Sequence, residues 1–129
     1  MAGTWRRLAR ALLSAIWIRS GVRAFRDPSY LMPRVKAALP WLPEPERVAR
    51  GQAAVQVAFG GALALGICPR LAASTLALDL VPVTYVGHPF WTETTSEGRN
   101  PQVTHFLKNL AMLGGLVMVV LEEQARRDC

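Results

Sequence analysis

The side chains able to do chemistry stand at a few positions inside apolar stretches. His105, Lys108, Asn109 and Met112 follow the spacing i, i+3, i+4, i+7, which places them on one face of a helix. An imidazole, an ammonium and a carboxamide on one face make it suited to lining a polar pocket. Asp79 stands alone in the preceding apolar run. In lipid such a group costs about 2.5 to 3.5 kcal/mol, so we expect it to face the protein interior and to find a partner.

Topology selects the other residues of this candidate pocket. Consecutive spans joined by short links run antiparallel, so the ends of the first and third spans share one side with the starts of the second and fourth. Arg19 or Lys108 is the expected partner of Asp79. The polar residues on this side, with Asp79 lying deeper, are Arg19, Arg23, Gln52, Gln56, His88, His105, Lys108 and Asn109.

Simpler roles for the same residues stay open. Arg19, Arg23 and Lys108 can instead extend along their aliphatic stems and place their charges at the lipid headgroups. Gln52 and Gln56 can simply form hydrogen bonds between helices. Phe90 and Trp91 suit an aromatic belt at the membrane interface. His88 and His105 lack a third ligand, so no metal site is expected.

Several other kinds of chemistry are not expected. No Ser/His/Asp arrangement, glycine-rich phosphate loop or zinc signature occurs, so catalytic residues are left unassigned. Cys68 and Cys129 form neither a CxxC pair nor a metal-ligand spacing, which predicts no dithiol redox centre in this chain.

Four apolar stretches would position these groups. Helices are predicted at about residues 5–26, 45–66, 69–86 and 101–124, with Asn100 and Pro101 starting the last one. Each is close to the roughly 20 residues that cross a hydrocarbon core of about 30 Å. Residues 27–44 are rich in proline and form either a short element in the membrane interface or an irregular loop.

The predicted fold is therefore a single all-α domain over residues 1–129, an integral membrane four-helix bundle. Small residues on the second helix, and the pair Gly114 and Gly115 on the fourth, predict close helix packing. A kink is expected at Pro82. A soluble bundle is the alternative, but the centres of the second and fourth helices show no polar face. The small-residue stripe of the second helix is Ala54, Ala58, Ala62 and Gly66.

Charge points to lipid as the partner. The chain has 129 residues, 51% of them hydrophobic, and a net charge of +6. The cations are scattered over loops and helix ends, so nucleic-acid binding is not expected and anionic headgroups are the favoured partner. Arg6, Arg7 and Arg10 precede the first apolar run, which we interpret as an uncleaved span. The charges do not choose an orientation, and the N-terminal cluster places both chain ends in the cytoplasm.

Short motifs resemble those of the bacterial DoxX family over nearly the whole chain. The specific ones are HPFW at residues 88–91 and HFLKN at residues 105–109, followed by GGL at 114–116. The first span also ends in a similar Ser-Gly-Val at residues 20–22, although Arg23 replaces the usual lysine. The resemblance implies a four-span protein of the bacterial inner membrane with both termini cytoplasmic. Relatives belong to a quinol oxidase complex, or are associated with thiosulfate:quinone oxidoreduction or with the removal of oxidants.

The leading hypothesis is an accessory, non-catalytic subunit of a membrane redox complex. Its polar pocket would contact a quinone headgroup or a redox-enzyme partner, because the converging side chains can hydrogen-bond a quinone carbonyl. One alternative is a small transport or permeability factor with Asp79 as its proton or substrate site. Another is a purely structural partner that packs through the small-residue stripe. The oligomeric state, including a homo-oligomer, is left open.

Overall fold

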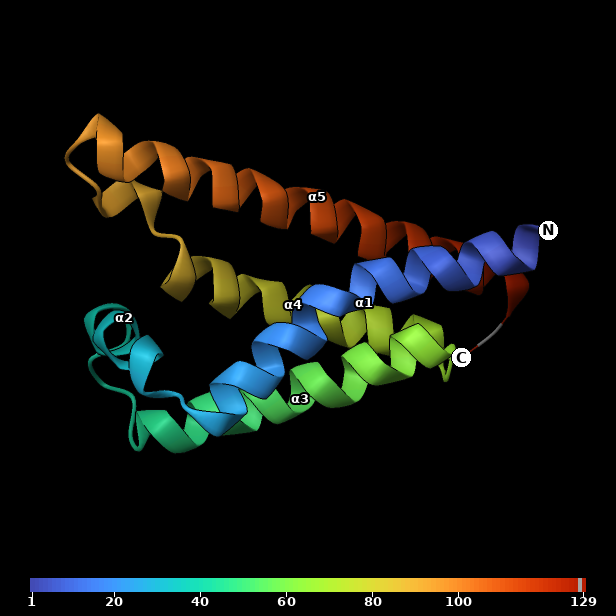
Figure 1. Ribbon diagram of the computed structural model, residues 1–129, viewed down its shortest axis with the longest axis horizontal. Helices are drawn as coiled ribbons and strands as arrows, with labels where there is room; N and C mark the ends of the chain where they lie inside the picture. Colours follow the sequence, from blue (N-terminus) through green and yellow to red (C-terminus); the bar gives the residue numbers. More distant parts are fainter. Residues whose placement is uncertain (128) are drawn as a thin grey trace.

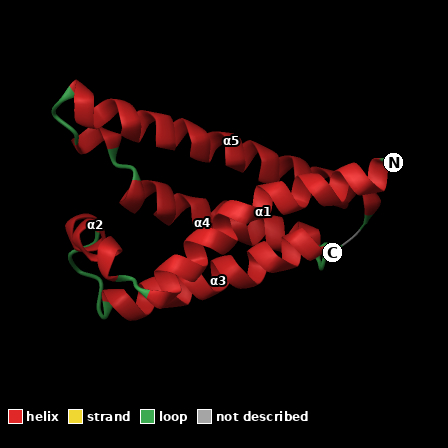
Figure 2. Ribbon diagram, in the orientation of Figure 1, coloured by secondary structure: helices red, strands yellow, loops and turns green. Residues whose placement is uncertain are grey.

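The protein is entirely helical in the part that the computed structural model describes, residues 1–127 and 129. Its helices are α1 (Ala2–Arg26), α2 (Met32–Ala38), α3 (Pro45–Leu65), α4 (Pro69–Gly87) and α5 (Ser96–Arg126), with 3-10 turns at Ser29–Leu31 and Phe90–Thr92. Figure 2 shows helices joined by short loops, with no strand among these residues. The predicted all-α class is confirmed.

The four long helices lie side by side along the long axis, with α1 crossing α3 and α4 running beside α5 (Figure 1). Both labelled chain ends lie at one end of the bundle, which we call the terminal end (Figure 1). The turn between α3 and α4 lies there too. The short helix α2 packs against α3 and α4 at the opposite end, the α2 end. The proline-rich segment therefore contains a short helix, and its place in a membrane interface stays a prediction.

Local sequence accounts for most helix ends. α1 stops at Arg26 because Pro28 follows, and Asp27 is extended and accepts the amide of Ser29 at 3.0 Å. α3 begins at Pro45, where a missing amide costs nothing. The predicted start of the last helix at Asn100 and Pro101 is wrong. α5 begins at Ser96, because the side chain of Thr95 accepts the amide of Gly98 at 3.2 Å and caps it.

α1 and α3 approach closely through small residues. A Cβ added at Gly21 would lie 2.8 Å from the carbonyl oxygen of Ala53 and 2.8 Å from a methyl of Val57. A Cβ added at Gly60 would lie 3.1 Å from the side chain of Ile18. A side chain at Gly21 therefore cannot be accommodated without moving α3, whereas at Gly60 a small shift of Ile18 would make room for a methyl group.

The prediction that the small-residue stripe of α3 packs against a neighbouring helix is wrong. Ala54 and Ala58 are exposed, whereas Ala53 on the next face is 1% exposed. The buried face of α3 carries Ala53 and Gln56, and Gln56 donates a hydrogen bond to Asp79 of α4. On α5, Gly114 likewise meets no neighbouring atom within 4 Å, so close packing there is limited to Gly115 against Leu13.

The bundle has an apolar exterior and a partly polar interior. Its core packs Trp17, Leu63, Leu76 and Leu116 from all four long helices. Polar residues are buried too, and large apolar side chains are exposed on every long helix. The buried polar ones are Arg10, Ser14, Gln56, Asp79, Asn109 and Glu123, and the most exposed apolar ones within the long helices include Trp5, Leu12, Leu65, Leu78, Val81 and Met118. A surface of this kind marks contact with lipid or with other proteins.

Among the described residues, α5 is the one helix that is long and apolar enough, by length and composition only, to cross a membrane. The apolar stretches of the other long helices are shorter or are interrupted by charged residues. α1 contains six arginines, and α4 has Arg70 and Asp79. The expected bundle of four membrane spans therefore stays a prediction for α1, α3 and α4.

Candidate functional site

The centre of the site is a carboxylate held by two carboxamides. The side-chain nitrogen of Gln52 donates to Asp79 Oδ1 at 2.9 Å, and that of Gln56 donates to Asp79 Oδ2 at 2.7 Å. The two glutamines are one helical turn apart on α3, so both face the same position on α4. Asp79 is 9% exposed. The expected pairing of Asp79 with Arg19 or Lys108 is wrong, because both cations are exposed and the glutamines occupy the carboxylate.

A cavity of about 300 Å³ lies beside this cluster, between α1, α2, α3 and α4. Its walls are mostly apolar side chains from all four helices. Polar groups enter it at a few places only. They are Ser20, Tyr30, Arg34, Gln52, Gln56 and His88, among apolar neighbours that include Val35, Leu39, Leu42, Val83 and Val86.

A second, smaller cavity of about 100 Å³ lies between α1, α4 and α5. Five of the residues singled out in the sequence line it: Gln56, His88, Lys108, Asn109 and Met112. Gln56 and His88 line both cavities, and Gln56 joins them to Asp79. The structure thus brings these residues together around two adjoining cavities.

The two histidines form a stacked pair. Their ring centroids are 4.7 Å apart and the rings are inclined by 16°. Nδ1 of His88 lies 3.0 Å from the side-chain oxygen of Gln102. Burial lowers the pKa of His88, so its imidazole is neutral at neutral pH. No group of three or more metal-ligating side chains occurs among the described residues, and the stack has no third His, Cys, Asp or Glu beside it.

Asn109 has a clear structural role. Its side-chain nitrogen donates to Thr84 Oγ1 at 2.9 Å, which links α5 to α4, and the residue is 4% exposed. A buried carboxamide needs such a partner.

Arg19 and Arg23 do not join the cavities. Both are exposed, and the guanidinium of Arg23 lies over the ring of Tyr30, 4.2 Å from its centroid. That contact is a cation–π interaction beside the larger cavity, which Tyr30 also lines. A role of both arginines at the lipid headgroups stays a prediction.

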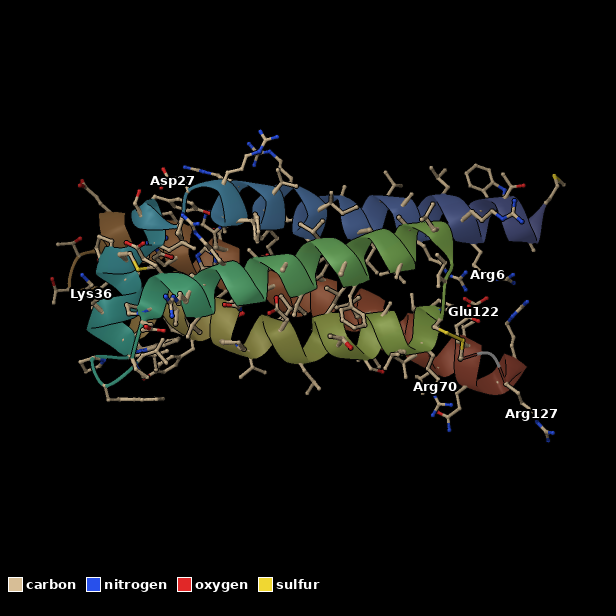
Figure 3. All side chains as sticks on the ribbon, turned by 90° about the horizontal axis from the view of Figure 1, so that it is seen from below. Arg6, Asp27, Lys36, Arg70, Glu122 and Arg127 are labelled. Atoms are coloured by element: carbon tan, nitrogen blue, oxygen red, sulfur yellow. A yellow bond between two sulfur atoms is a disulfide. The ribbon has the colours of Figure 1, made fainter. Side chains whose placement is uncertain are left out.

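Two features at the terminal end are not evident from the sequence. Cys68 and Cys129 form a disulfide across 61 residues, a pairing that their spacing alone does not predict. Arg10 of α1 forms an ion pair with Glu123 of α5, which is fully buried. Figure 3 shows the disulfide at this end, with Arg6 and Glu122 beside it. The antiparallel topology could have indicated both contacts, because it places Arg10, Cys68, Glu123 and Cys129 at the same end of the bundle.

An apolar exterior, buried polar pairs and a cavity with few polar groups define the class as a helical membrane protein. The family model for DoxX matches residues 6–89, well over half of the 129-residue chain. The chain therefore belongs to the DoxX family, and the resemblance is confirmed. The match covers α1 to α4 and ends before the HFLKN motif, so that motif lies outside the matched region. No curated protein and no solved structure matches the chain.

Proposed function

We propose that the protein is an accessory subunit of a redox complex in the bacterial inner membrane, and that its larger cavity binds a quinone headgroup. In this proposal α1, α3, α4 and α5 all cross the bilayer. The 21 residues of α3 rise about 31 Å at 1.5 Å each, which matches a hydrocarbon core of about 30 Å. Exposed apolar side chains on all four helices support this placement.

The observation that carries the proposal is the composition of the larger cavity. A quinone has an apolar ring and tail, and two carbonyl oxygens that accept hydrogen bonds. The cavity offers apolar walls with Arg34, Gln52 and Gln56 as donors, and its volume of about 300 Å³ lies at the lower end of small-molecule sites.

Asp79 fixes how the glutamines meet a ligand. Both oxygens of Asp79 accept hydrogen bonds in the structure, so each glutamine turns its side-chain nitrogen toward this carboxyl group. The amide hydrogens that Asp79 does not use remain for a ligand oxygen, and each carboxamide oxygen remains as an acceptor. The cavity can therefore meet a quinone carbonyl with donors and a quinol hydroxyl with acceptors.

The test is direct binding of a short-chain ubiquinone or menaquinone analogue to the purified protein in lipid nanodiscs. Quinones quench nearby tryptophan, so fluorescence reports binding. We expect saturable quenching that weakens in Gln56→Leu and Gln52→Leu. Gln124→Leu changes an exposed glutamine of α5 and should bind as the unmodified protein does. Equal binding by all four proteins, or non-saturable quenching that follows lipid partitioning, would rule out the cavity as the quinone site.

One feature favours the orientation opposite to the expected one. The cations of the loops and helix ends do not choose between the two sides, because six lie at the terminal end and seven at the α2 end. Disulfides persist in oxidising compartments, and the disulfide is at the terminal end. In this proposal the α2 end therefore faces the cytoplasm.

A reporter fused after Cys129 tests this orientation. Alkaline phosphatase, which folds only where disulfides form, should be active at this position, and green fluorescent protein should be dark. The same reporters inserted into the loop between α2 and α3 should give the reverse result. Fluorescence after Cys129 would place the terminal end in the cytoplasm, in agreement with the N-terminal arginine cluster.

A further inference from the structure

The disulfide holds the end of the described chain against α4. Cys68 lies immediately before α4, and Cys129 follows α5. The backbone amide of Leu71, in the first turn of α4, donates to the carbonyl oxygen of Cys129 at 2.9 Å. Figure 3 shows the sulfur–sulfur bond at the terminal end, the end opposite to α2 and the larger cavity.

The surroundings of Cys68 favour it as a leaving group. It is the N-cap residue of α4, so its sulfur belongs to the end of the helix where the amide dipoles point their positive ends. That position stabilises a thiolate, as do nearby cations. Arg70 and Arg127, each two residues from one of the cysteines, lie at the same end of the bundle (Figure 3).

The two cysteine residues differ in exposure. Cys129 is exposed and Cys68 is half-buried. An incoming thiolate therefore reaches Cys129 first and leaves Cys68 as the displaced group. Exposed disulfides are the ones that exchange readily.

We infer that Cys68–Cys129 is a thiol–disulfide exchange site for an anionic low-molecular-weight thiol. The thiolate forms a bond to the sulfur of Cys129, the Cys68–Cys129 bond breaks, and its electron pair stays on Cys68 as a thiolate. One disulfide is consumed and one is formed, so no other oxidant or reductant is needed. The charge of the thiol follows from the arginines around the site, which attract carboxylates and repel ammonium groups. The inference stands apart from quinone binding, because the two sites lie at opposite ends of the bundle.

The experiment uses the full chain in nanodiscs and three thiols at equal thiolate concentration: reduced glutathione, neutral 2-mercaptoethanol and cationic cysteamine. Intact-protein mass spectrometry measures the mixed disulfide, and peptide mapping locates it. We expect a glutathione adduct on Cys129, a maleimide-reactive Cys68, and a rate that falls from glutathione to cysteamine. Added salt should reduce this difference, since it screens exposed charges.

Arg70→Gln should slow the reaction with glutathione severalfold and leave the reaction with 2-mercaptoethanol unchanged. Arg50→Gln removes an exposed arginine at the α2 end and should change neither rate. A disulfide that opens only after the protein is unfolded would overturn the inference, as would an adduct on Cys68. Equal rates for the three thiols would overturn the selection for anions.

Discussion

Asp79 of α4 accepts a hydrogen bond from Gln56 of α3 at 2.7 Å, and Gln56 lines both cavities. Asp79 therefore does not need a cation to be buried. Two amide donors satisfy both of its oxygens, and the apolar helix α4 can carry a carboxylate near its middle. Any ligand in the larger cavity meets glutamines whose orientation Asp79 has already set.

Replacing Gln56 by Leu should destabilise the protein by about 1 to 3 kcal/mol, because it leaves one oxygen of a buried carboxylate without its donor. Thermal unfolding in detergent micelles measures the loss. Gln124→Leu, on the exposed surface of α5, is the matched control and should unfold at an unchanged temperature. Unchanged stability in both variants would mean that the bond to Asp79 contributes nothing.

Asp79→Asn separates the proposed function from its alternatives. An asparagine side chain does not titrate, so a transport or permeability activity that depends on this carboxylate should be abolished. Quinone binding should weaken, because the carboxamide introduced at this position carries its own donor and would turn one glutamine away from its present orientation. A structural partner would keep its co-purifying proteins in this variant. Flux assays in proteoliposomes, quinone quenching and affinity purification measure the three outcomes separately.

The sequence predicts the helices well and the contacts between them less well. Proline at positions 28 and 45 marks helix ends that the structure reproduces, because the missing amide acts locally. The buried face predicted for α3 is wrong, since Ala54 and Ala53 are equally small and only the partner on α1 distinguishes them. The prediction that Arg19 or Lys108 pairs with Asp79 is wrong as well, because it also depends on how the helices are rotated. Topology predicts which helix ends meet, but the rotation of each helix decides which side chains touch.

Gly21→Ala should disrupt the contact between α1 and α3. Its new methyl would lie 2.8 Å from the backbone oxygen of Ala53, which cannot move without moving the helix. Overpacking of this kind costs about 1 to 3 kcal/mol. Gly61→Ala, on α3 with no neighbouring atom within 4 Å, should be neutral or stabilising because alanine favours helix. Equal stability of the two variants in thermal unfolding would contradict the close approach.

The stability of the α2 end should depend on pH through His88. Burial lowers the pKa of this imidazole in the folded protein, so the unfolded chain takes up its proton first as pH falls. The stabilisation is complete above the unfolded pKa of about 6.5 and is lost as pH falls toward the folded value. The unfolding temperature should therefore decrease more steeply below neutral pH in the unmodified protein than in His88→Gln. Parallel pH profiles would show that His88 contributes nothing to this dependence.

The buried pair of Arg10 and Glu123 should behave differently from the exposed pair of Arg6 and Glu122. Glu123→Leu removes the partner of a cation that is 9% exposed, which should cost about 3 to 5 kcal/mol. Replacing both residues by leucine should restore most of that loss, because no charge then remains buried. Glu122→Leu breaks a pair whose side chains are 25% and 42% exposed, so its effect should stay within about 1 kcal/mol. If the double variant were as unstable as Glu123→Leu alone, the loss would come from packing at Glu123 and the charge of Arg10 would not be its cause.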